Sequence, residues 1–253
     1  MPLAIIASAM ILAQWYFSDK IVLWTSGAKI VAKEEYPRLY EIVERLSANN
    51  GLPKPKVAVV NSLVPNAFAT AKGPKNSLVA VTSGILGLLD DDELEGVIGH
   101  ELSHVRRRDV LVLTLASVSS TVAWYLAQFG FYSGLQTRDR NTVGTTAIVV
   151  FVAIITWIVS FLIIKAISRY REYSADRGGA FMTGKPDKLA NALLKISDRI
   201  GNIPPKELEK VQKLNAFFII PALSGSSIAN LFSTHPPVEK PVQKLLEMKS
   251  GME

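Results

Sequence analysis

Two long stretches without a charged residue constrain this chain more than any other feature of its sequence. They run from residue 110 to residue 137 and from residue 141 to residue 164. Each exceeds the roughly 20 apolar residues with which a helix crosses a bilayer, and each is far longer than the average soluble helix. We therefore predict a transmembrane hairpin over 110–164 rather than a pair of buried core helices, and we expect the lipid bilayer to be a partner of the chain.

A third apolar segment opens the chain, from residue 1 to residue 17, and continues through Ile21–Trp24. It lacks the basic start that is typical of a cleavable signal peptide. With its continuation it is about long enough to span a membrane. We therefore predict an N-terminal transmembrane anchor over 1–24.

Basic residues predict the orientation of the hairpin. Its connecting loop has only Arg138 and Arg140, with Asp139 between them, whereas several basic residues flank its outer ends. By the positive-inside rule the outer ends lie in the cytoplasm. This predicts a multi-pass protein of the plasma membrane in which the segments before and after the hairpin, residues 25–109 and 165–253, face the cytoplasm. The flanking residues are Arg106, Arg107, Arg108, Lys165, Arg169 and Arg171.

The sequence His100-Glu101-Leu102-Ser103-His104 is an HExxH motif, and it uses two of the three histidines of the chain. On a helix, residues four apart lie on one face, so both imidazoles can reach one metal ion. Glu101 lies about 100° round the helix, where its carboxylate can contact a water on that metal. Two neutral nitrogen ligands, an open position and a carboxylate base are what a zinc hydrolase requires. We therefore predict Zn²⁺ bound by His100 and His104, with Glu101 as the general base.

A third metal ligand is predicted from the hairpin. His104 precedes the first apolar run by six residues, about 9 Å along a helix, and Glu172 follows the second run by eight residues, about 12 Å. Two antiparallel helices would thus bring both side chains to nearly the same level below the membrane. His235, the remaining histidine, is the alternative third ligand. Asp176 lies one turn beyond Glu172, where it can hold a ligating histidine by its second ring nitrogen.

Composition excludes other classes of chemistry. The chain has no cysteine, which excludes disulfides and thiol catalysis. Its net charge of +6 is mostly explained by the membrane flanks, and no basic-aromatic motif accompanies it. We therefore predict no nucleic-acid partner.

Periodicity predicts the other elements. Asp90 and Glu93 form a capping box at the start of the HExxH helix. We expect helices over 33–49 and 186–200, strands over 57–60 and 78–82, and a possible third strand over 66–70. In the 186–200 helix, the residues expected to face a core are Leu189, Leu193, Leu194 and Ile196.

A set of short motifs accompanies HExxH in a fixed order along the chain. They are Pro65–Thr70, Ala80–Gly84, Arg108-Asp109, Glu172–Arg177 and Phe232–Pro237. With them the chain resembles the M48 family of membrane metalloproteases, and within it the HtpX heat-shock protease group, from about Phe17 to its end. The sequence departs from that group at Arg107, where asparagine is usual, and at Pro241, where the closing helix usually continues. HtpX proteins also usually begin with two membrane helices, whereas this sequence has room for one, as a naturally short or a truncated start.

The resemblance implies the roles of the site residues. It implies His100, His104 and Glu172 as zinc ligands, Glu101 as the general base and Asp176 as their supporting carboxylate. It further implies that His235 lies near the scissile carbonyl, with a helix-start role as the alternative. The segment Asn66, Ala67 and Phe68 would lie beside the cleft, where an extended substrate pairs with a strand edge; a strand-edge turn with a core phenylalanine is the alternative.

The predicted fold is mainly α: a membrane-anchored helical metalloprotease domain with a small β-sheet, and a gluzincin-like HExxH motif plus downstream glutamate. The predicted parts are the anchor 1–24, a first cytoplasmic part 25–109, the transmembrane hairpin 110–164 and a second cytoplasmic part 165–253. The predicted function is zinc-dependent cleavage of misfolded or extended membrane proteins and unfolded polypeptides; the resemblance implies a role in membrane-protein quality control. The alternatives are a prenyl-protein (CAAX) endopeptidase of the same family and a zinc-bound membrane scaffold without catalysis.

Overall fold

The computed structural model describes residues 9–10, 12–13, 15–115, 121–122, 124–125, 128, 132, 140–204 and 238–251. The chain divides into two compact units. One comprises Met1–Tyr16 and Leu111–Ile167, and the other comprises Phe17–Val110 and Ser168–Glu253. The second unit holds the HExxH motif, Glu172 and Asp176.

The chain is mainly helical with a small mixed sheet, as predicted. In chain order the elements are α2 (Ser18–Ser26), β1 (Lys29–Ile30), α3 (Pro37–Asn49), β2 (Lys56–Val60), β3 (Ala67–Gly73), β4 (Asn76–Thr82), α4 (Ser83–Leu88), α5 (Asp91–Arg107), α7 (Arg140–Thr183), α8 (Pro186–Gly201) and α11 (Glu239–Ser250). The strands predicted over 57–60 and 78–82 are confirmed as β2 and β4, and the possible third strand is confirmed as β3.

The sheet has the order β1-β2-β4-β3, so β3 forms one of its edges in the described part of the chain. β2 and β4 are parallel, and the other neighbours are antiparallel. Side chains alternate between the two faces of a strand. Val57 and Val59 accordingly join the main core with α3 and α5, whereas Ala58 and Val60 join a smaller core with Val22 of α2.

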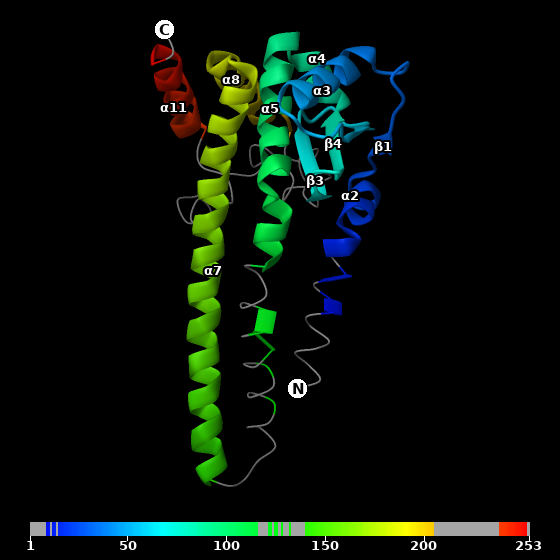
Figure 1. The fold of residues 1–253 in the computed structure, drawn as a ribbon. Coiled ribbons are helices and arrows are strands. Elements are labelled where there is room, and N and C mark those ends of the chain that lie inside the picture. The colour runs from blue at the N-terminus through cyan, green and yellow to red at the C-terminus, as the bar shows by residue number, and fades with distance from the viewer. Residues whose placement is uncertain are drawn as a thin grey trace. The chain divides into compact units, whose positions relative to one another are not determined.

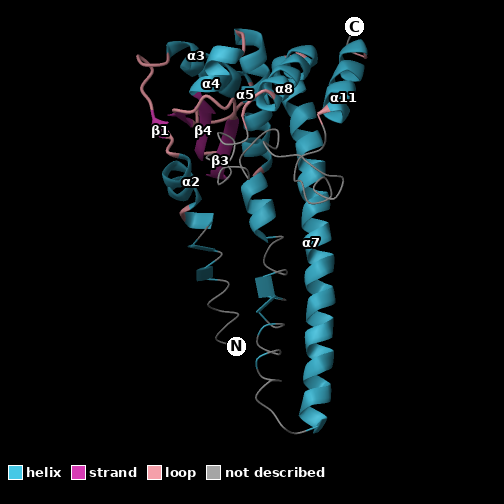
Figure 2. Ribbon diagram, turned by 180° about the vertical axis from the view of Figure 1, so that it is seen from behind, coloured by secondary structure: helices cyan, strands magenta, loops and turns pink. Residues whose placement is uncertain are grey.

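α5 is the central helix of this unit. Its capping box between Asp90 and Glu93 is confirmed, and its residues Leu94, Val97, Ile98 and Leu102 have no exposed surface. It lies between α8 and the sheet (Figure 1), and the view from behind shows the strands on one side of α5 and α8 on the other (Figure 2). Because α5 is packed on both sides, the motif that it carries is held rigidly.

Two details of the predicted helices are wrong. α3 begins at Pro37 instead of Lys33, because proline, which has no N–H to donate, suits the first helical position. In α8, Leu194 is 45% exposed instead of facing the core. Leu189, Leu193 and Ile196 share one buried face at spacings of four and three, and residue 194 lies about 140° round the helix from residue 189.

The membrane candidate begins in the first unit and ends in the second. α7 is a single helix of 44 residues, and its part Ala147–Thr183 is long and apolar enough to cross a membrane; only 6% of the most apolar window of this part is buried. The run predicted over 141–164 lies within α7. Of the run predicted over 110–137, residues 110–115 are helical, whereas 116–120 and most of 123–137 lie outside the described residues.

The predicted anchor 1–24 falls on both units. Residues 1–8, 11 and 14 of it lie outside the described residues. The boundary between the units follows Tyr16, and α2 packs Val22 against the sheet of the second unit. The unit boundary therefore lies before Trp24, the end predicted from the sequence.

Candidate metal centre

The two histidines of the HExxH motif lie one turn apart near the end of α5. Their Nε2 atoms are 3.1 Å apart, and their rings meet edge to face with centroids separated by 4.8 Å. His100 is buried and His104 is partly buried. The helix therefore brings the two nitrogens together at a site that is largely protected from water.

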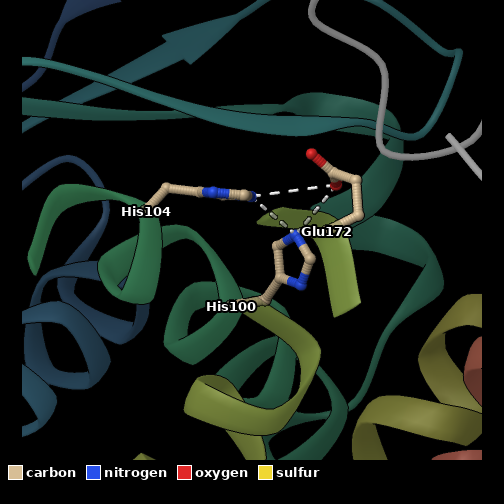
Figure 3. Close-up of side chains that lie close together, drawn as sticks. All are labelled: His100, His104 and Glu172. Carbon is tan, nitrogen blue, oxygen red and sulfur yellow. Dashed lines mark hydrogen bonds and ion pairs between the residues drawn. The ribbon is translucent and has the colours of Figure 1, made fainter. Parts of the chain in front are cut away.

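Glu172 reaches the same point from α7. Its Oε2 atom lies 3.7 Å from Nε2 of His100 and 3.8 Å from Nε2 of His104. Figure 3 shows the three side chains pointing toward one another. In the described part of the chain these three residues form the group that could hold a metal ion, with donor atoms within 4.8 Å of one another.

The spacing of the donors fits a zinc ion. Given the separations of 3.1, 3.7 and 3.8 Å, the point in the plane of the three atoms that is equidistant from them lies about 2.1 Å from each. That is the length of zinc–nitrogen and zinc–oxygen bonds. Two histidines and one glutamate are also a donor set of catalytic zinc sites, which keep a fourth position open.

The charges at the site also call for a cation. Four acidic side chains, each exposed by 8% or less, gather at the two imidazoles, and burying carboxylates without compensating charge is costly. Arg171 pairs with one of them, Asp109. A divalent cation would compensate further charge. The four are Glu101, Asp109, Glu172 and Asp176.

Glycines allow α7 to approach α5 closely enough to deliver Glu172. A Cβ atom on Gly179 would lie 2.7 Å from the backbone nitrogen of His100, and one on Gly178 would lie 2.0 Å from Oγ of Ser103. On the facing side, a Cβ atom on Gly99 would lie 2.9 Å from the Thr183 side chain. Side chains at these positions would separate the two helices that carry the donors.

Asp176 lies where the sequence predicted a supporting carboxylate. Its Oδ1 atom is 2.9 Å from Nδ1 of His100, the ring nitrogen that faces away from the candidate ion. Burial lowers the pKa of His100, but hydrogen bonding to Asp176 and the carboxylate of Glu172 outweighs burial, so that this pKa stands well above its usual value. A hydrogen bond at Nδ1 orients the ring and directs Nε2 toward the metal.

His104 has an equivalent partner, which no local pattern in the sequence indicates. Nδ1 of His104 lies 2.6 Å from Oδ2 of Asp109, and Nε of Arg171 lies 3.0 Å from the same oxygen. Arg108-Asp109 is one of the motifs that carry the family resemblance. Residues five apart lie on different sides of a helix, however, so this spacing does not predict a contact between Asp109 and His104. From the sequence alone, Arg171 is one of the basic residues that flank the predicted hairpin.

Glu101 is 5% exposed and directly follows His100 on α5. Its charge contributes to the raised pKa of His100. The structure thus keeps Glu101 next to the site; its role as a base remains a prediction.

The other predicted site residues have different outcomes. The side chains of Asn66, Ala67 and Phe68 are buried, and Phe68 belongs to the smaller core. These side chains are not available to a substrate, so contact would have to use the backbone edge of β3. His235 lies outside the described residues.

The structure and the donor set together define a helical metalloprotease of the HExxH class. Comparison with known proteins narrows this class: the chain belongs to peptidase family M48, which matches residues 33–249. It is 52% identical over 241 residues to Protease HtpX homolog 2 of Methanosarcina mazei, covering 95% of this chain and 82% of that protein. It is 48% identical over 252 residues to Protease HtpX homolog of Moorella thermoacetica, covering 98% and 84%.

A solved structure has the same fold. The crystal structure of S. mikatae Ste24p matches with a TM-score of 0.62 and 17% identity, covering 94% of this chain and 56% of that chain. At this identity the likeness concerns the fold alone, and this chain spans little more than half of that larger protein.

Proposed function

We propose that the chain is a membrane-embedded zinc endopeptidase that cleaves misfolded or extended membrane proteins on the cytoplasmic side. The observation that carries the proposal is the convergence of His100, His104 and Glu172 beside Glu101. The membership in peptidase family M48 and the similarity to HtpX proteases support peptide-bond hydrolysis.

His100, His104 and Glu172 would hold the zinc ion. When bound, zinc supplies Lewis-acid chemistry, which polarises the substrate carbonyl and lowers the pKa of the attacking water. Glu101 accepts the proton of that water and then donates it to the leaving amine. Asp176 keeps the His100 ring oriented, so that the donors need not reorganise during the reaction.

Substrate binding is proposed at the edge of β3. This strand pairs with β4 and forms one edge of the sheet in the described part of the chain, and it packs against α5, which carries the motif. An extended polypeptide could add to this edge through backbone hydrogen bonds. Such binding favours unfolded or extended segments over folded ones.

A membrane setting is supported by the apolar part of α7 and by the HtpX relatives. The proposed cytoplasmic orientation is supported by the basic residues at the outer ends of the predicted hairpin. Cytoplasmic loops and tails of membrane proteins would then be within reach of the site.

The decisive experiment is cleavage of an unfolded test protein by the zinc-loaded, detergent-solubilised chain, with Glu101→Gln run beside it. We expect the parent to cut and the variant to lose at least about 100-fold in rate, because a positioned base contributes on the order of 10²–10⁴. Zinc binding, measured by chelator competition, should be retained in the variant. A zinc-loaded parent that does not cut, or a variant that cuts at the parental rate, would contradict the proposal.

A further inference from the structure

We propose that Asp109 is a positioning residue for the metal site, which fixes the orientation of His104 while Arg171 holds Asp109 in place. This inference rests on the proposed function, because His104, which Asp109 would orient, is one of the proposed zinc ligands.

The geometry of the two histidines is matched. Nδ1 of His100 lies 2.9 Å from Asp176, and Nδ1 of His104 lies 2.6 Å from Asp109. In both residues Nε2 faces the candidate ion. A carboxylate at Nδ1 accepts the N–H of the ring, leaves the lone pair on Nε2 and makes that nitrogen a better ligand. Asp109 is 3% exposed, so water does not compete strongly for this contact.

A break in the helix makes this contact possible. In a continuous helix, the residue five positions after His104 would lie about 140° round the axis from it. The chain instead takes a left-handed conformation at Arg108, with φ of 55°, directly after α5. This turn ends the helix and lets Asp109 fold back onto the His104 ring. Arg108 is the only residue other than glycine with positive φ in the described part of the chain, a conformation that is sterically unfavourable for a residue with a Cβ atom.

Arg171 links Asp109 to the part of α7 that carries Glu172, the third proposed ligand. Its Nε atom lies 3.0 Å from Oδ2 of Asp109, and its side chain is 13% exposed. It also directly precedes Glu172 in α7. The ion pair therefore balances the buried charge of Asp109 and ties the end of α5 to the part of α7 that provides Glu172.

The test is the zinc affinity of the full detergent-solubilised chain, measured by competition with a chelator. We expect Asp109→Asn to weaken zinc binding by about 10- to 100-fold, the range known for such supporting residues, and Asp176→Asn to do the same. The matched control is Arg45→Gln. It breaks another ion pair to a buried carboxylate of α5, that of Arg45 with Glu95 at 3.0 Å, and this carboxylate does not contact either histidine of the site. The control should bind zinc within twofold of the parent.

A second variant separates support of His104 from general stability. Asp109→Asn leaves Arg171 without its ion-pair partner, so the double variant Asp109→Asn/Arg171→Gln removes both charges. We expect its zinc affinity to remain at least about 10-fold below that of the parent, even if its thermal stability recovers. Parental affinity in the double variant, or a change below twofold in Asp109→Asn, would overturn the inference.

The inference and the proposed function fail in different ways. A chain that binds zinc but cuts no substrate would contradict the proposed function, while the affinity series would still decide the role of Asp109. A parent chain that binds no zinc would overturn both. As an independent readout, ¹⁵N-histidine NMR of the zinc-loaded parent should show His104 protonated at Nδ1; protonation at Nε2 would contradict the inference.

Discussion

Gly179 of α7 lies so close to His100 of α5 that a Cβ atom at residue 179 would stand 2.7 Å from the backbone nitrogen of His100 and 2.9 Å from its Cα atom. Both neighbouring atoms belong to the backbone of a helix that is packed on two sides. The contact therefore sets the distance between the helix that carries the histidines and the helix that carries Glu172.

We predict that Gly179→Ala forces the two helices apart. The clash should lower the free energy of unfolding by about 1–3 kcal/mol, as overpacking does, and it should weaken zinc binding because Glu172 moves away from the histidines. Thermal unfolding and chelator competition measure the two effects. Gly87→Ala is the control, because a Cβ atom there has no neighbour within 4 Å. Equal behaviour of the two variants would contradict this account of the helix contact.

Zinc affinity should depend on pH through His100. The hydrogen bond to Asp176 and the carboxylate of Glu172 hold the pKa of His100 well above its usual value, against the opposing effect of burial. In the metal-free chain His100 therefore keeps its proton to higher pH, and zinc must displace it. We expect the affinity to rise with pH until the raised pKa is passed, and to level off beyond it. A chelator-competition series across pH checks this, and an affinity that does not change would contradict it.

The stability of the metal-free chain should show the opposite dependence. A group whose pKa is higher in the folded than in the unfolded state stabilises the fold below its unfolded pKa, about 6.5 for histidine. This contribution is lost as the pH rises through the folded pKa. Thermal unfolding of the metal-free chain should therefore show the contribution of His100 decreasing toward alkaline pH, and Asp176→Asn should reduce that decrease. An unchanged pH dependence in this variant would mean that other groups cause it.

Arg108→Gly should relieve the strain at the end of α5. Glycine adopts positive φ without the steric cost of a side chain, and the Arg108 side chain is exposed, so little packing is lost. We expect unchanged or higher stability, by up to about 1 kcal/mol, with zinc affinity close to that of the parent. Clear destabilisation in thermal unfolding would show that the guanidinium makes a contact on which the turn depends.

Local signals in the sequence were sufficient for α5 and its motif. The spacing of His100 and His104 follows from the helical repeat, and the capping box of Asp90 and Glu93 uses residues three positions apart. The position of Glu172 near His104 could be predicted because α7 continues without interruption from the apolar run, so that the distance of Glu172 along the helix is set by a rise of about 1.5 Å per residue.

The partners of Asp109 could not be predicted in this way. Its contact with His104 depends on a left-handed residue, Arg108, and arginine gives no signal for that conformation. Its contact with Arg171 joins residues that are far apart in the sequence, and a single sequence shows nothing of such pairs. The error at Leu194 has a different, local cause: residue 194 lies about 140° round α8 from Leu189, so the helical repeat already puts it off the buried face.

By itself, the sequence determined the class of chemistry, the helix that carries it and the apolar segments, because each depends on composition or on residues within a few turns of one another. The tertiary structure decided how the donors meet. The glycines of α7 and α5 allow the approach of Glu172, and the turn at Arg108 brings a second carboxylate to the histidines. These contacts depend on the close packing of two helices and on one backbone conformation, which local propensity does not specify.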